Sequence, residues 1–307
     1  MARVPLCTAA LAAGLLLAAS ASGQAWTQEP GRAYVKLSLQ DTRTSEQYRE
    51  DGSRAPYAAG LEANGYEDRS LYLYAEYGLS ARSTLVLLLP MKRITVRTPH
   101  PQASSGLPGT DRPIQRSADR LQNVAVGWRY DLTGAFDLST NGRHRTALNT
   151  AVRIPTGYDL EGRPAVGPGQ VDVEAMLHYG LSLWPAPFYA QMGAGFRART
   201  SLYGLSSGDA ATPDYGNEWL LHGEAGMSVG PLLLQGLLFG TFSNQPPETG
   251  FDPANPVPTR QRYLKTGLGL TAYPVGSIGI SVQLFATPTG ANTVRSTDWF
   301  FGVESRF

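Results

Sequence analysis

The chain ends with the stretch TDWFFGVESRF, residues 297–307, and this stretch decides the fold. Counting back from the last residue, one set of alternate positions is mostly aromatic or aliphatic: Phe307, Ser305, Val303, Phe301 and Trp299. The other set carries three charges: Arg306, Glu304, Gly302, Phe300 and Asp298. A period of two is the period of a β-strand with one apolar and one polar face. The stretch therefore predicts a strand that separates two different environments.

A final strand that stops on an aromatic residue resembles the closing strand of bacterial outer-membrane β-barrels, which the insertion machinery reads. The resemblance implies that four side chains form a membrane-insertion signal for the barrel-assembly machinery: Trp299, Phe301, Val303 and Phe307. An amphipathic strand at the end of a soluble β-sandwich is the alternative interpretation. The remainder of the chain has to discriminate between the two.

Twelve segments alternate in the same manner as the last one. Their ranges are 31–41, 67–78, 83–97, 120–131, 145–156, 169–181, 188–200, 217–229, 232–243, 262–273, 278–288 and 297–307. Segment 232–243 is nearly all apolar, so its two faces cannot be told apart, and Pro90 in segment 83–97 indicates a bulge or an edge. Beyond the N-terminus no stretch reaches the roughly 20 apolar residues of a membrane helix.

The connections between these segments alternate between long and short. The long ones are 42–66, 98–119, 157–168, 201–216, 244–261 and 289–296, and most of the others are tight turns, with 132–144 as the exception. Aromatic residues gather near both strand ends: Tyr77, Tyr130, Tyr179, Trp184, Tyr273 and Phe307 at the short turns, and Phe196, Trp219, Phe242 and Trp299 at the long loops. An even strand count with short turns, long loops and aromatic girdles is typical of outer-membrane barrels.

These patterns predict an all-β fold: a closed antiparallel transmembrane β-barrel of 12 strands with short periplasmic turns and long extracellular loops. Closure follows because an open sheet edge in hydrocarbon leaves backbone groups without partners. The N-terminus predicts a cleaved secretory signal peptide over residues 1–25, with a basic start, the apolar run AALAAGLLLAA at 9–19 and small residues after it. The cleavage bond falls between Ala21 and Ala25, and the sequence does not select one bond within that stretch. Residues 26–307 are then a single barrel domain in the outer membrane. Cys7 leaves with the signal peptide.

The inward faces carry nearly equal numbers of bases and acids. The bases are Lys36, Arg129, Arg145, Arg153, Arg197, Arg199, Lys265 and Arg306, and the acids are Glu76, Asp172, Glu174, Glu218, Glu224, Asp298 and Glu304. Near the long loops, bases and acids alternate from strand to strand: Arg153, then Asp172 and Glu174, then Arg197 and Arg199, then Glu218. This order predicts cross-strand ion pairs. The layer has two interpretations: a set of ion pairs that stiffens the barrel, or a constriction that selects solutes. One layer can fulfil both roles.

Two inward histidines, His178 and His222, lie near Glu174 and Glu224 in sequence. A metal site or a proton switch is one interpretation, and a hydrogen-bonded lumen histidine is the one we prefer. We expect no metal and no cofactor. We also expect no enzymatic activity, because the one histidine of outward parity, His144, lies at a periplasmic turn and no GxSxG, HExxH or phosphate-loop pattern occurs.

The stretch from 153 to 200 resembles the outer-membrane transporters labelled "MetA-pathway of phenol degradation". A strand ending in Pro-Thr-Gly, then Gly-x-Gly-x-x-Asp at the next strand, then a glycine-rich strand ending in Phe-Arg-x-Arg carries the resemblance. The matching residues are Pro155, Thr156, Gly157, Gly167, Gly169, Asp172, Arg197 and Arg199. The resemblance implies a transport-related barrel for aromatic or other hydrophobic compounds, and it supplies no catalytic residues.

The first hypothesis is therefore an outer-membrane channel or transporter for small solutes. Its selectivity would come from the loops 42–66, 98–119 and 244–261 and from lumen residues Arg153, Asp172, Glu174, His178, Arg197, Arg199, Glu218, His222 and Glu224. A non-conducting structural or envelope-interaction barrel is the alternative, and a lipid-modifying enzyme is a third. The expected partners are outer-membrane lipids, the barrel-assembly machinery and a small-molecule solute. A net charge of +1 does not indicate nucleic acid.

Overall fold

The computed structural model describes residues 24–59, 64–102, 112–135, 142–205, 214–245 and 252–307. The predicted signal peptide therefore lies outside the described residues, except for Gln24 and Ala25 at its end. Within the described ranges, the elements are β-strands and one helical turn, α2 (Leu132–Ala135). No helix among them is long and apolar enough to cross a membrane.

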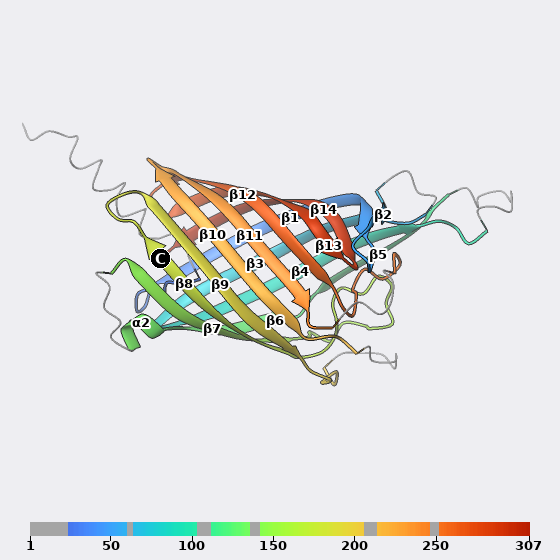
Figure 1. The fold of residues 1–307 in the computed structure, drawn as a ribbon, viewed down its shortest axis with the longest axis horizontal. Helices are drawn as coiled ribbons and strands as arrows, with labels where there is room; N and C mark the ends of the chain where they lie inside the picture. The colour runs from blue at the N-terminus through green and yellow to red at the C-terminus, as the bar shows by residue number, and fades with distance from the viewer. Residues whose placement is uncertain (1–23, 60–63, 103–111, 136–141, 206–213, 246–251) are drawn as a thin grey trace, which may run out of the picture.

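Twelve strands of the described chain form one closed antiparallel ring, as the sequence predicts (Figure 1). In chain order they are β1 (Ala33–Tyr48), β3 (Tyr66–Ser80), β4 (Ser83–Thr98), β6 (Val124–Asp131), β7 (His144–Ile154), β8 (Asp172–Ser182), β9 (Phe188–Arg199), β10 (Glu218–Val229), β11 (Leu232–Ser243), β12 (Arg262–Val275), β13 (Ile278–Ala291) and β14 (Thr293–Arg306). Each pairs with the next along the chain, and β14 pairs with β1, for example Val303 opposite Leu37. This last pairing removes the sheet edge.

Two further strands lie outside the ring. β2 (Arg54–Pro56) pairs with the end of β1, and β5 (Ile114–Leu121) pairs with the second half of β4. The neighbour of β4 changes from β6 to β5 around Pro90, whose carbonyl accepts the N–H of Gln122 at 2.8 Å. The interruption expected at Pro90 is thus present, and β4 and β5 run on beyond the ring as a hairpin (Figure 1).

Some predicted boundaries are wrong. The first strand continues to Tyr48 instead of ending near Asp41, and strand β5 occupies part of the predicted loop 98–119. Segment 120–131 divides at Gln122 and Asn123 between β5 and β6, and most of 289–296 belongs to β13 and β14. The strand extensions have one cause: polar residues are typical of loops, whereas strands that extend past the membrane into water can be polar on both faces. The division of segment 120–131 coincides with the change of the β4 neighbour at Pro90.

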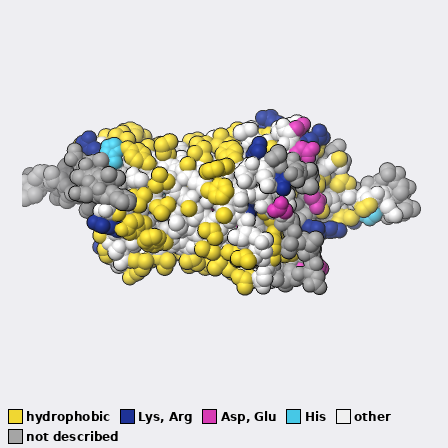
Figure 2. Space-filling model, turned by 60° about the horizontal axis from the view of Figure 1, so that its bottom comes forward, with side chains coloured by type: hydrophobic (Ala, Val, Ile, Leu, Met, Phe, Trp, Pro, Cys, Tyr) yellow, Lys and Arg dark blue, Asp and Glu magenta, His cyan; other side chains and the backbone are white. Residues whose placement is uncertain are grey.

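Large apolar side chains point outward around the ring, which the barrel prediction requires. Leu268 is 71% exposed, Met192 61% and Trp219 58%, values that water would disfavour and that lipid accommodates. Figure 2 shows hydrophobic side chains over the middle of the molecule, basic side chains toward both ends, and acidic side chains toward the end that carries β2 and β5. The structure distinguishes the two faces of segment 232–243: the outward face holds Leu232 and Leu234, and the inward face holds Leu233 and Leu237.

The short turns lie at one end of the barrel. The β4–β5 hairpin and the long connections lie at the other end (Figure 1). Most of the predicted girdle residues near the short turns are exposed, for example Tyr77 at 47% and Tyr179 at 42%. Tyr273 is a correction: it is 8% exposed and donates a hydrogen bond of 2.7 Å to the inward Glu304, so it belongs to the lumen. Its position, one residue after outward Ala272, follows from the alternation of the strand.

Candidate functional site in the lumen

The predicted polar layer is a continuous network of ion pairs across β7, β8, β9 and β10. Glu174 lies at its centre, with Oε2 3.1 Å from Nε of Arg153 and 3.0 Å from Nη2 of Arg197. Arg197 continues to Glu218 of β10 through a contact of 2.5 Å between Nη1 and Oε2. The register produces these contacts, because Arg197 is the direct partner of Glu174 on one side and of Glu218 on the other.

Arg199 completes the network. Its Nη1 lies 2.9 Å from Oε1 of Glu218, its Nε lies 3.5 Å from Oδ1 of Asp172, and its guanidinium carbon lies 4.7 Å from the centre of the Tyr215 ring. The layer thus joins three bases to three acids, and its net charge is zero. A layer in which every base has an acidic partner restrains the side-chain positions and favours neither anions nor cations by charge alone.

The two histidines lie side by side inside the barrel, with ring centres 5.5 Å apart. His178 is the hydrogen-bonded lumen histidine that we prefer from the sequence: its Nδ1 is 2.8 Å from the amide nitrogen of Asn149, whereas no hydrogen bond joins it to Glu174. His222 lies 4.0 Å from Glu224, a distance too long for a hydrogen bond. In the described ranges no three histidine, cysteine, aspartate or glutamate side chains are grouped to hold a metal ion.

A segment at the start of the described chain, Gln24–Gln28, enters the barrel at its short-turn end. Asn149 donates to the carbonyl of Gln24 at 2.9 Å, Arg129 donates to the carbonyl of Trp26 at 2.8 Å, and the N–H of Ala25 donates to Oε1 of Gln191 at 3.2 Å. These partners come from β6, β7 and β9, and Gln28 donates to Oε2 of Glu76 on β3 at 2.6 Å. Since β3 and β9 lie on opposite sides of the ring, the segment spans the lumen. No periodicity marks this segment in the sequence.

Glycines on the barrel wall make room for the entering segment. An ideal Cβ at Gly78 would lie 2.0 Å from the carbonyl oxygen of Glu29, and one at Gly180 would lie 2.7 Å from Cβ of Ala25. Any side chain at either position would collide with the segment. The Trp26 ring meets the Tyr189 ring edge to face at 6.2 Å, which holds the segment against β9.

Inward glutamates near the same end are held by tyrosines. The bonds run from Tyr74 to Glu76, from Tyr189 to Glu224, and from Tyr34 and Tyr273 to Glu304. Arg129 adds an ion pair of 2.8 Å to Glu76, and Lys36 approaches Glu304 to 3.5 Å. The glutamates at this end of the lumen are therefore each held by tyrosine hydroxyls, and two of them also face a cation.

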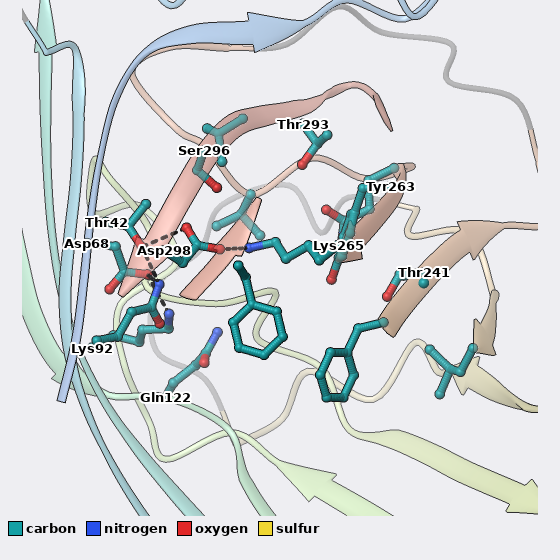
Figure 3. Close-up of a pocket in the computed structure, with 18 of the residues that line it drawn as sticks. Thr42, Asp68, Lys92, Gln122, Thr241, Tyr263, Lys265, Thr293, Ser296 and Asp298 are labelled. Carbon is teal, nitrogen blue, oxygen red and sulfur yellow. Dashed lines mark hydrogen bonds and ion pairs between the residues drawn. The ribbon is translucent and has the colours of Figure 1, made fainter. Parts of the chain in front are cut away.

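Two lysine–aspartate pairs lie on the opposite wall, near the long-loop end. Nζ of Lys92 is 2.6 Å from Oδ2 of Asp68, and Nζ of Lys265 donates to Oδ2 of Asp298 (Figure 3). Lys265 and Asp298 are among the inward charges predicted from the sequence, whereas Lys92 and Asp68 are not. Strict alternation along β4 and β3 would have placed both inward, because Lys92 has the parity of buried Ile94 and Asp68 that of buried Ser70.

One cavity of about 710 Å³ connects the ion-pair network and the lysine–aspartate pairs. Its volume falls within the range of small-molecule sites. Aromatic and aliphatic side chains share its wall with the charges: Tyr66, Tyr72, Ile94, Met176, Leu220, Phe239, Tyr263, Phe285 and Phe300. The lumen is therefore amphipathic, whereas the inward charge count had indicated a polar one.

Loops from the long-loop end cover this cavity. Val166 and Pro168 of the β7–β8 connection line it, as do Val257 and Pro258 before β12. The two connections meet where the N–H of Ala165 donates to Oδ1 of Asn255 at 3.0 Å. The cavity thus lies between a cover of loops and the Gln24–Gln28 segment.

Tyr158 anchors the cover to the barrel. Its hydroxyl donates to Oδ1 of Asn123 and accepts the N–H of Gly169 at 2.8 Å. Burial raises the pKa of Tyr158 above its ordinary value, so the hydroxyl keeps its proton and remains a donor throughout the neutral range. Gly157 and Gly169, with φ of 82° and 81°, supply the left-handed turns at the two ends of this loop.

The residues of the predicted insertion signal lie on the outward face of β14. Trp299 is 43% exposed, Phe301 47%, Val303 53% and Phe307 66%. His144 lies at the short-turn end, where its Nδ1 is 2.5 Å from the Tyr179 hydroxyl. The positions agree with the predicted faces, and the recognition of the strand by the assembly machinery stays a prediction.

No protein-family model matches the chain, and no curated protein matches it. Among solved structures, the COG4313 outer-membrane channel from Pseudomonas putida F1 is similar, with a TM-score of 0.65, 13% identity, and coverage of 94% of this chain and 100% of that one. The KdgM porin has a TM-score of 0.46 at 7% identity, with 88% and 99% coverage. The Ralstonia pickettii toluene transporter TbuX has a TM-score of 0.46 at 9% identity, with 91% and 90% coverage. With its closed ring and apolar exterior, the chain has the fold of an outer-membrane β-barrel and resides in the outer membrane.

Proposed function

We propose that the protein is an outer-membrane channel that admits small solutes through its lumen. The observation that carries the proposal is the cavity of about 710 Å³ inside the closed ring, lined by charged and aromatic side chains. A barrel serving only as a membrane anchor has no need of an internal cavity of ligand size. The resemblance of the stretch from 153 to 200 to transporters labelled "MetA-pathway of phenol degradation" adds aromatic and other hydrophobic compounds to the expected solutes.

In this proposal the solute passes the Arg/Glu network and then the Gln24–Gln28 segment. The network is neutral in sum, so it sorts solutes by size and by hydrogen bonding more than by the sign of their charge. The segment lies across the path at the short-turn end, held by Asn149, Arg129 and Gln191. Passage requires that this segment move, since its hydrogen bonds span the lumen.

Planar-bilayer conductance and liposome swelling of the purified protein test the proposal. We expect discrete conductance steps and swelling with small solutes that is faster for aromatic compounds than for sugars of similar mass. Boiled protein serves as the control, because heat opens the ring. If the folded barrel neither conducts ions nor admits any solute, the channel proposal is wrong.

A non-conducting barrel with a structural or envelope-interaction role is the second candidate. The observation that favours it is the coverage of the cavity on both sides, by the loops at Ala165 and Asn255 and by the Gln24–Gln28 segment. Absence of conductance in the full chain, together with absence of conductance after removal of the segment, would support this role. Conductance in either form favours the channel.

A further inference from the structure

A row of aromatic rings follows the inner wall of the cavity around the barrel. Phe239 of β11 meets Phe285 of β13 with ring centres 5.5 Å apart, Phe285 meets Phe300 of β14 at 5.6 Å, and Phe300 meets Tyr72 of β3 at 6.2 Å. All four rings line the cavity. The lumen of a water-filled pore is polar, so four adjoining rings facing it form an apolar surface suited to an apolar ligand.

Gly267 on β12 makes this row continuous. It lies between the strands of Phe239 and Phe285, and an ideal Cβ there would be 2.4 Å from the Phe285 ring. With no side chain at this position, the Phe285 ring lies against the wall and reaches Phe239 across the intervening strand. The glycine therefore shapes an aromatic surface on the cavity wall.

The lysine–aspartate pairs stand directly beside this surface. Asp298, the partner of Lys265, is the cross-strand neighbour of Phe285, and Phe300 follows two residues later on the same face of β14. Two residues along a strand span about 7 Å. A ligand whose ring lies on Phe285 and Phe300 can thus place a polar group near Nζ of Lys265. Figure 3 shows Lys92 and Lys265 reaching their aspartates around the same cavity.

The two aspartates are already well supplied with donors. Oδ1 of Asp298 accepts the Thr42 hydroxyl at 2.8 Å and its Oδ2 accepts Lys265, while Asp68 accepts bonds from Ser70 and Lys92. An ammonium group carries three N–H donors, and each aspartate takes one of them. The side chains of Lys92 and Lys265 line the cavity and are 14% and 27% exposed, with their ammonium groups 5.3 Å and 5.9 Å from the centres of the Tyr72 and Tyr263 rings. The wall offers donors more than acceptors, which favours an anion.

We propose that this wall is a binding site for a small aromatic carboxylate, with the ring on Phe239, Phe285 and Phe300 and the carboxylate accepting hydrogen bonds from Lys92 and Lys265. The inference rests on the proposed function, since it places this site on the solute path. The Arg153–Arg197–Arg199 network belongs to β7 and β9 on the other wall, whereas the row of rings belongs to β11, β13, β14 and β3, so the network does not combine a cation with these rings.

Calorimetric titration of the purified full chain in detergent tests the site. The probes are benzoate, benzyl alcohol with the same ring and no charge, and acetate with the same carboxylate and no ring. We expect saturable binding of benzoate, binding of benzyl alcohol about tenfold weaker, and no saturation with acetate, because the charged hydrogen bonds and the ring contacts act together. Failure of benzoate to bind, or equal binding of acetate, overturns the site.

Paired variants separate the two halves of the site. Two double variants each remove one cation and one anion while keeping hydrogen-bonding groups in place. They are Lys265→Gln with Asp298→Asn, and Lys92→Gln with Asp68→Asn. Either pair should weaken benzoate about tenfold and leave benzyl alcohol unchanged. Phe285→Ala with Phe300→Ala should weaken both ligands. Phe301→Ala, on the lipid side of the same strand, is the matched control and should change neither.

Heat-modifiable migration in electrophoresis establishes that each variant is folded. If one lysine pair variant does not fold, the other still tests the carboxylate position. Unchanged benzoate affinity in a folded lysine pair variant refutes the carboxylate position, and unchanged benzyl alcohol affinity in the folded phenylalanine variant refutes the ring position. Bilayer conductance separates this inference from the proposed function. Benzoate binding without conductance supports the site and refutes the channel. Conductance without benzoate binding supports the channel and refutes the site.

Discussion

Arg129 is the largest side chain that the described barrel buries completely, and its ion pair with Glu76 is 2.8 Å long. Arg129→Met should lower the free energy of unfolding by about 3 to 5 kcal/mol, because it leaves the carboxylate of Glu76 buried without its cation. Urea unfolding followed by tryptophan fluorescence measures the change. Arg129→Met with Glu76→Gln should recover much of the loss, and equal stabilities of the single and double variants would contradict the explanation.

Arg197 and Arg199 hold the ion-pair network together, with contacts to Glu174, Asp172 and Glu218. Replacing both arginines by alanine should raise single-channel conductance, because it removes two long side chains and frees the three acids from their positions. The same variant should favour cations, since the acids then lack their partners. Reversal-potential measurements in a salt gradient detect the shift. Arg116→Ala on the exposed β5 hairpin is the control, and equal effects of both variants would contradict a role for the network.

At the scale of elements, the Gln24–Gln28 segment closes the short-turn end of the lumen. Its deletion should increase conductance while leaving the barrel folded, because its contacts are hydrogen bonds from the wall and one aromatic contact. Gly78→Ala offers a second route, since the added methyl would collide with the carbonyl of Glu29 and displace the chain. Conductance of the deletion variant equal to that of the full chain would show that the segment does not obstruct the path.

We propose that the β14 strand is the element that the assembly machinery recognises. Phe307→Ala should reduce the folded fraction in outer membranes, because this aromatic side chain is exposed and available for contact. Phe188→Ala, at an outward position with a similar environment near the short turns, is the control. Heat-modifiable protein in isolated membranes measures the folded fraction, and equal losses for the two variants would count against a specific signal.

At the scale of the whole molecule, closure of the ring is the property on which the others depend. Cysteines introduced at Leu37 and Val303, direct neighbours on β1 and β14, should form a cross-link on oxidation. A cysteine pair at Leu37 and Val152, which belong to strands that do not pair, should remain unlinked. Electrophoresis without reducing agent distinguishes the two. A cross-link in the second pair and none in the first would refute the ring.

The polar network could be predicted from sequence because the period of two assigns each side chain to a face. Antiparallel neighbours then bring the opposite charges of Arg197 and Glu174 together. The partner of His178 could not be predicted, since Glu174 is near it in sequence while Asn149 is near it only across a strand pair. The Gln24–Gln28 segment was missed for a similar reason: it has no periodicity, and its partners lie on β6, β7 and β9.

The sequence by itself determined a ring of twelve strands, its outward apolar face and the end at which the turns are short. These properties depend on alternation, turn length and the requirement that lipid-exposed backbone be paired, and all three can be read along the chain. The tertiary structure decided what occupies the lumen: a segment across one end, loops over the other, and a row of rings beside two lysines. These depend on which residues meet across the barrel, because side chains far apart in sequence share one enclosed space.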